Sequence, residues 1–234
     1  MDSGPETSPS APRDIFVTTR WTMVLSAGHK SSLHSDRALA ELCQTYWCSL
    51  YAFVRRQGKT KEDAEDLVQA FFVRFLAKNY LEGLAAEHGK FRAFLLASLK
   101  HFLANEWDKS QRQKRGGGVA HLSLDWQSAD ERFRLDPPDP SSPDKSFDRE
   151  WALALLERVV KRLADECTAD GKATLFEQAK GYLMVGEAAI PYAEAAHRLR
   201  KRYGELLLHE IAETLEDPAQ VPEELRALQF ALAG

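Results

Sequence analysis

The sequence predicts an all-α protein in which two small helical domains are joined by a linker rich in Pro and Gly. Two observations lead to this fold class. Apolar residues recur at three- and four-residue steps in both halves of the chain, which places them along one face of each helix. Between these halves, Gly116-Gly117-Gly118 and four prolines interrupt the helical pattern over residues 116 to 144.

The changes in composition also predict the domain boundaries. Residues 1–19, which contain several Pro and Ser, are expected to be a disordered lead. A first helical domain is expected over 20–115, a linker over 116–145 and a second helical domain with an acidic end over 146–234. The chain has 234 residues, of which 44% are apolar, and this is enough for one domain or two small ones.

Charge and cysteine content restrict the class of protein. The formal net charge of −4 argues against a protein that coats nucleic acid through bulk charge, although Lys109 to Arg115 form a local basic patch. The three cysteines form no Cys-x-x-Cys pair, and we expect Cys43 and Cys48 to be small buried thiols in a reducing compartment. No signal peptide and no apolar run of about 18–20 residues is present, so we expect a cytoplasmic protein without a membrane partner.

The first domain is expected to contain three well-defined helices. A short helix over 20–25, capped by Thr19, is expected before them. The first long helix covers 37–56, is capped by Ser35 or Asp36, and stops at Gly58. Its apolar stripe is Leu39, Leu42, Cys43, Tyr46, Leu50, Phe53 and Val54.

The next two helices differ in surface charge. The helix over 61–78 opens with the capping-box pattern Thr60-Lys61-Glu62-Asp63 and carries a charged face opposite its Phe-rich stripe. The helix over 90–115 carries a mostly basic surface, and its Phe91, Phe94, Phe102 and Trp107 lie on the apolar stripe, where a core role is favoured. Without other information, both charged faces are consistent with ordinary solvated surfaces.

The second domain is also expected to be helical. Phe147, Trp151, Leu155, Val159 and Leu163 step by four residues in a helix that begins near Ser146. A shorter helix over 173–183 and a continuous helix over 192–215 follow. A last short helix is expected after Pro222. Within the linker, only residues 121–126 are apolar enough to dock on the first domain.

Three segments in the first domain resemble region 2 of a bacterial RNA polymerase sigma factor, most closely of the extracytoplasmic-function group. They are Glu62–Phe72, Phe91–Leu95 and Asn105–Asp108, in this order. The resemblance implies a transcription initiation factor that binds core RNA polymerase and the minus-ten element of promoter DNA. It also makes the second domain similar to region 4 of that family.

The family resemblance implies the candidate site residues. The first charged face would dock on the coiled-coil clamp element of the polymerase β′ subunit through Glu62, Glu65, Asp66, Gln69 and Arg74. The basic helix would hold melted promoter DNA, where cations neutralise phosphates and polar tips hold unstacked bases. Its candidates are Arg92, Lys100, His101, Asn105, Lys109, Arg112, Lys114 and Arg115, and those of the second domain are Arg198, Arg200, Lys201 and Arg202.

The second domain departs from the family at the helix-turn-helix. No Gly or other helix breaker separates Ala193 from Tyr203, where the family has a turn and most of a recognition helix. We therefore expect one continuous helix and impaired recognition of the minus-thirty-five element. The remaining basic residues would contact phosphates without reading sequence.

Two other functions stay open, and an enzyme is not expected. The chain contains no phosphate-binding loop, no zinc-spaced Cys/His cluster and no nucleophile elbow, so we expect no cofactor and no metal. The alternatives are a helical interaction module or degenerate sigma-like protein without promoter activity, and a nucleic-acid-binding module unconnected to polymerase. An anti-sigma or other regulatory protein is a further partner that the resemblance allows.

Overall fold

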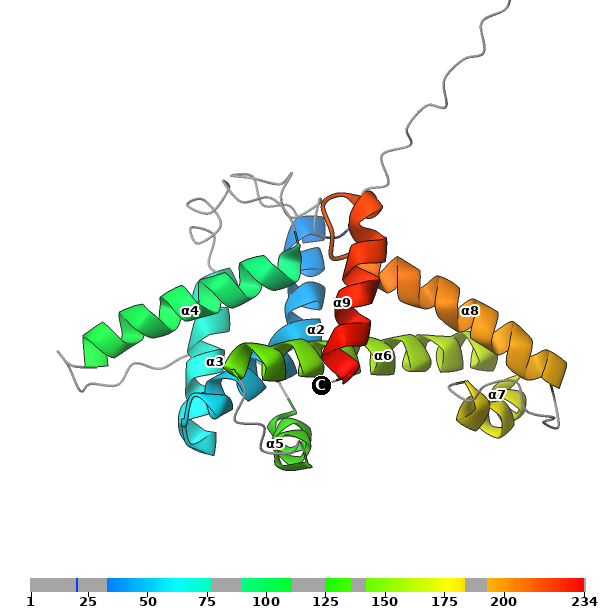
Figure 1. The fold of residues 1–234 in the computed structure, drawn as a ribbon, viewed down its shortest axis with the longest axis horizontal. Helices are drawn as coiled ribbons and strands as arrows, with labels where there is room; N and C mark the ends of the chain where they lie inside the picture. Colours follow the sequence, from blue (N-terminus) through cyan, green and yellow to red (C-terminus); the bar gives the residue numbers. More distant parts are fainter. Residues whose placement is uncertain are drawn as a thin grey trace, which may run out of the picture.

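The computed structural model describes residues 20, 33–76, 90–110, 125–135, 142–183 and 193–233, and these form an all-α fold (Figure 1). The helices on the N-terminal side of Pro137 are α2 (Leu33–Arg56), α3 (Lys61–Leu76), α4 (Phe91–Ser110) and α5 (Trp126–Leu135). Those that follow are α6 (Pro143–Ala169), α7 (Ala173–Ala179), the 3-10 turn η1 (Lys180–Tyr182), α8 (Ala193–Ala212), the 3-10 turn η2 (Pro218–Gln220) and α9 (Val221–Ala233).

The long helix α6 organises the packing. Its 27 residues correspond to about 40 Å at 1.5 Å per residue, and Figure 1 shows α2–α5 near one end and α7 and α8 near the other. The most extensive helix–helix contact in the described part of the chain is that of α2 with α6. Helices on the two sides of the expected linker therefore pack directly on each other. The division into two domains remains a prediction.

Two apolar cores lie along α6. The first core joins residues from α2, α3, α4, α5, α6, α8 and α9, among them Phe71, Phe91, Trp151 and Leu228, all at most 3% exposed. The second core lies toward the other end of α6, against α7 and α8, and consists of Val159, Leu163, Cys167, Phe176, Ala179, Leu199, Tyr203 and Leu206. The apolar stripes found in the sequence thus form the interior, as expected for amphipathic helices.

Several local predictions are confirmed. The Thr60 hydroxyl oxygen accepts a hydrogen bond from the Asp63 backbone N–H at 3.1 Å, which caps α3. Gly58 ends α2 with a φ of +83°, a conformation that favours glycine. Cys43 and Cys48 are buried free thiols, and burial raises the pKa of Cys48 to about 12. The expected helix over 20–25 lies outside the described residues beyond Arg20.

The helix α5 was not expected, because residues 126–135 fall within the predicted linker. Trp126 of α5 packs edge-on against Trp47 of α2, with ring centroids 5.3 Å apart. Asp130, which is 3% exposed, accepts hydrogen bonds from the Tyr51 hydroxyl at 2.8 Å and from Arg55 Nη1 at 2.6 Å. These polar and aromatic contacts hold α5 on α2.

The two glycines Gly58 and Gly204 are expected to respond oppositely to substitution by alanine. At both positions an added Cβ meets no atom within 4 Å, so only the backbone conformation decides the outcome. G58A should lower the free energy of unfolding by about 1–2 kcal/mol, because a non-glycine residue is strained at positive φ. G204A lies inside α8 and should raise that free energy by about 0.5–1 kcal/mol. Urea unfolding followed by circular dichroism measures both, and equal effects would contradict the prediction.

Candidate functional site

The exposed face of α3 carries most of the residues predicted to bind polymerase. Glu62 and Asp66 are exposed, and Glu65 is half-buried with Lys61 Nζ 3.9 Å from its carboxylate. Burial raises the pKa of Glu65, and the positive charge of Lys61, which lowers it, offsets this effect only in part. Arg74 is exposed and lies 3.7 Å from the Glu106 carboxylate of α4, so an ion pair connects the two helices. The face is acidic at its start and basic at its end.

Gln69 does not belong to this exposed face. It is 6% exposed, whereas the sequence pattern placed it with the charged residues. It follows the buried Val68 by one residue, about 100° around the helix axis, and so lies at the border of the apolar stripe. Because α3 packs against both α2 and α4, this border is covered. Gln69 is therefore better explained by packing than by binding a partner.

Arg92, one of the predicted DNA-binding residues, is held by contacts within the chain. Its guanidinium donates to the Glu224 carboxylate at 2.9 Å, pairs with Asp148, and lies over the Trp151 ring at 4.4 Å from the centroid. Burial would lower the pKa of Arg92, but the hydrogen bonds and charges of Glu224 and Asp148 outweigh burial and raise it. In this arrangement the side chain is committed to contacts within the protein.

The other described candidates on α4 are more open. Lys100 is exposed and forms a 2.6 Å ion pair with Asp144 at the start of α6. His101 is exposed, and its ring Nδ1 lies 3.2 Å from the Asn105 side-chain nitrogen. The aromatic stripe beneath them is core, because Phe91 and Phe102 are buried. The side chains of Trp107 and Lys109, and residues Arg112, Lys114 and Arg115, lie outside the described part of the structure.

The basic residues of α8 divide into two kinds. Arg200 donates to the Tyr182 carbonyl oxygen at 3.0 and 3.1 Å, and Arg202 pairs with Glu166 of α6 at 2.8 Å. These two side chains tie α8 to its neighbours. Arg198 and Lys201 are exposed, and within the described ranges no ion pair is seen for either. The predicted continuous helix is confirmed, since α8 runs without a turn from Ala193 to Ala212.

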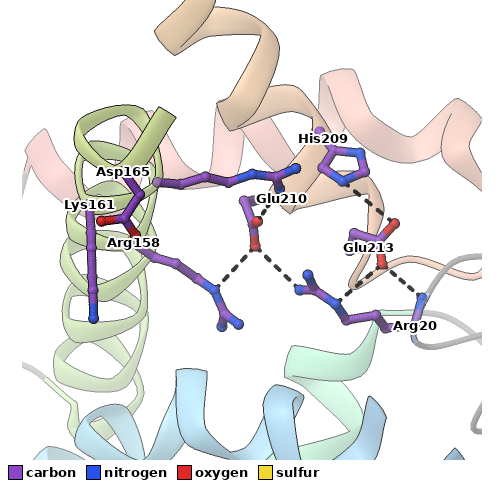
Figure 2. Close-up of a pocket in the computed structure, with 8 residues that line it drawn as sticks. Arg20, Arg158, Lys161, Asp165, His209, Glu210 and Glu213 are labelled. Atoms are coloured by element: carbon purple, nitrogen blue, oxygen red, sulfur yellow. Dashed lines mark hydrogen bonds and ion pairs between the residues drawn. The ribbon is translucent and has the colours of Figure 1, made fainter. Parts of the chain in front are cut away.

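A polar pocket of about 330 Å³ between α6 and α8 was not predicted (Figure 2). At its base, the Glu210 carboxylate is 4% exposed and lies 2.8 Å from Arg162, 3.3 Å from Arg158 and 3.4 Å from Arg20. Glu213 accepts a hydrogen bond from the Arg20 backbone N–H at 3.1 Å. Cations and carboxylates are paired here, so the pocket is best explained as an ion-pair cluster that stabilises the fold.

The acidic residues that meet the basic helix were also missed. Glu223 and Glu224 of α9 contact Lys90 and Arg92, which precede them by more than 130 positions in the chain. The only signal in the sequence was the change from basic to acidic residues after Glu205. That signal indicates a charged segment but does not identify its partner.

Comparison with known proteins gives one informative match. No protein-family model matches the chain, and no solved structure matches it. The chain is similar to the ECF RNA polymerase sigma factor SigX of Bacillus subtilis (strain 168), with 27% identity over 179 residues. The matched part is 75% of this chain and 84% of SigX. Among the described helices, none is long and apolar enough to cross a membrane. The similarity supports kinship with sigma factors of this kind.

Proposed function

We propose that the chain is a sigma-type transcription initiation factor. The observation that carries this proposal is the similarity to SigX, which extends over three quarters of the chain and most of SigX. Two features of the structure are compatible with the proposal. One is a charged, exposed face on α3, and the other is the neighbouring helix α4 with polar and basic residues at its surface.

The α3 face is the proposed contact with the β′ clamp element of core RNA polymerase. Glu62, Asp66 and Arg74 are exposed, and Val73 adds an apolar group with 36% of its surface exposed. An apolar contact with charges around it suits a helical partner, because complementary charges speed encounter and set the register of docking. The buried Gln69 is left out of this proposed contact.

Changing Glu62, Glu65 and Asp66 to alanine should weaken binding to purified core RNA polymerase. We expect a loss of about tenfold or more, equivalent to about 1.4 kcal/mol, because complementary charges at the contact are removed. A fluorescence titration with labelled protein measures the affinity. The control is E131A/E177A, which removes exposed carboxylates from α5 and α7 and should bind as the unmodified protein does. Failure of the folded, unmodified chain to bind the enzyme would refute the proposed function.

The proposed DNA contact is with single-stranded minus-ten promoter DNA. His101 and Asn105 lie one turn apart on the same face of α4, and Lys100 is adjacent to His101, so one strand could follow this surface. Recognition of the minus-thirty-five element is proposed to be impaired, because a helix-turn-helix needs a turn before its recognition helix and α8 is continuous. Exposed Arg198 and Lys201 would then contact phosphates only.

A second candidate function is a helical interaction protein without promoter activity. The observation in its favour is that Arg92 and Arg202, both predicted to contact DNA, are held in ion pairs within the chain. A run-off transcription assay with core enzyme distinguishes the two functions. Binding to core polymerase without initiation at any promoter in a genomic template library would favour this second function.

A further inference from the structure

The start of α4 contacts the segment between α8 and α9 through its backbone, and α9 through its side chains. The Phe91 backbone N–H donates to the Thr214 carbonyl oxygen at 3.0 Å, and Lys90 forms an isolated antiparallel bridge with Leu215. These contacts bring the basic residues at positions 90 and 92 beside α9. The segment between α8 and α9 therefore determines what these residues meet.

The carboxylates of α9 neutralise both basic residues. Glu224 is 1% exposed, and its two oxygens lie 3.0 Å from Lys90 Nζ and 2.9 Å from Arg92 Nε. Glu223 lies 2.7 Å from Lys90 Nζ and is itself largely exposed. A buried carboxylate is destabilised without nearby cations, so Lys90 and Arg92 stabilise α9 in this position.

The start of α6 extends the same acidic cover. Asp148 pairs with Arg92, and Asp144 lies 2.6 Å from Lys100 Nζ. Four carboxylates thus meet three cations along the first part of α4 and the residue before it, and we call Asp144, Asp148, Glu223 and Glu224 the acidic cover. Carboxylate oxygens hold Lys and Arg through the same charge-assisted hydrogen bonds that phosphate oxygens use. Each of these cations can therefore bind a carboxylate or a phosphate through the same donors.

We propose that the acidic cover is an intramolecular competitor of DNA, in which α9 keeps Lys90 and Arg92 from phosphates and the start of α6 keeps Lys100 from them. This inference rests on the proposed function, in which α4 contacts single-stranded DNA. It adds a regulated step, because α9 must leave the start of α4 before Lys90 can bind a phosphate, and Arg92 must in addition leave Asp148 of α6. DNA and α9 then exclude each other, and each weakens the binding of the other equally.

The test compares the full-length protein with its E223Q/E224Q variant for binding to a fluorescent single-stranded oligodeoxynucleotide at several salt concentrations. The variant should bind about tenfold more tightly. The slope of log K against log salt should steepen by about 0.7, because Lys90 is freed and each freed cation adds about 0.7 on a single strand, whereas Arg92 stays paired with Asp148. The control E131Q/E177Q makes the same change in net charge on α5 and α7 and should leave both quantities unchanged.

Each outcome decides the matter. Unchanged or weaker DNA binding by a folded E223Q/E224Q variant would overturn the inference. Because Glu224 is buried, D144N is the second variant, since Asp144 is 48% exposed and its removal frees Lys100 alone. It should steepen the salt slope by about 0.7, and an unchanged slope would also overturn the inference. Titration of the same proteins with core RNA polymerase tests the proposed function separately. If the unmodified protein does not bind the polymerase, the proposed function is refuted. If it binds the polymerase but the variants bind DNA no more tightly than it does, only the proposed competition between the acidic cover and DNA is refuted.

Discussion

Replacement of Trp151 by alanine is expected to lower the free energy of unfolding by about 3–5 kcal/mol. Trp151 is 1% exposed and belongs to the first apolar core, which joins α6 to helices on both sides of the expected linker. The substitution removes the largest side chain that is fully buried among the described residues, and it leaves a cavity that the surrounding helices can fill only in part. It also removes the ring beneath the Arg92 guanidinium.

Urea unfolding of W151A, followed by far-UV circular dichroism, measures this effect. The matched aromatic control is F230A, because Phe230 is 74% exposed and its loss should change the free energy by at most about 0.5 kcal/mol. A single transition shifted to lower urea is expected if α2 and α6 unfold together. Two transitions, of which only one is shifted by W151A, would show that the predicted domains over 20–115 and 146–234 unfold independently.

The helices themselves were predictable because their signals are local. Each signal depends on residues a few positions apart: the Phe-rich stripe of α3, the cap of α3 at Thr60, and the end of α2 at Gly58. The same holds for α8, where the absence of a helix breaker predicted a continuous helix. The helix α5 escaped notice because its ten residues are mostly polar and lie between Gly- and Pro-rich segments. Its contacts with α2, through Asp130 and Trp126, are tertiary.

The candidate site was less predictable, for the same physical reason. Family resemblance suggested a DNA-binding role for Arg92, but the carboxylate that holds it belongs to Glu224, 132 positions later in the chain. Helical periodicity placed Gln69 on the exposed face, but the width of the buried stripe depends on how many neighbours α3 packs against. Local patterns predict which residues are charged or apolar, whereas pairing across helices decides which of them are available to a partner.

Substitution of Glu210 by glutamine should have the second largest effect, a loss of about 2–4 kcal/mol. Removal of one partner from a buried ion pair costs about 3–5 kcal/mol, because the remaining charge stays desolvated. The cost here is expected to be somewhat lower, since Arg158 and Arg162 are 30% and 37% exposed and water can reach them. Arg20 also loses one of its carboxylates, although Glu41 and Glu213 remain within 3.5 Å of it.

The matched control for E210Q is E177Q. The comparison shows whether burial or the distance between the charged atoms determines how much an ion pair stabilises the fold. Glu177 lies 2.6 Å from Lys180, which is closer than any contact of Glu210 with its arginines, but both side chains of this pair are at least half exposed. If distance determined the strength, E177Q would be the more damaging change. Because water screens an exposed pair, we expect it to cost at most about 0.5 kcal/mol. Equal midpoints in urea unfolding would mean that solvent reaches the Glu210 cluster, and that α8 is held on α6 by the second apolar core instead.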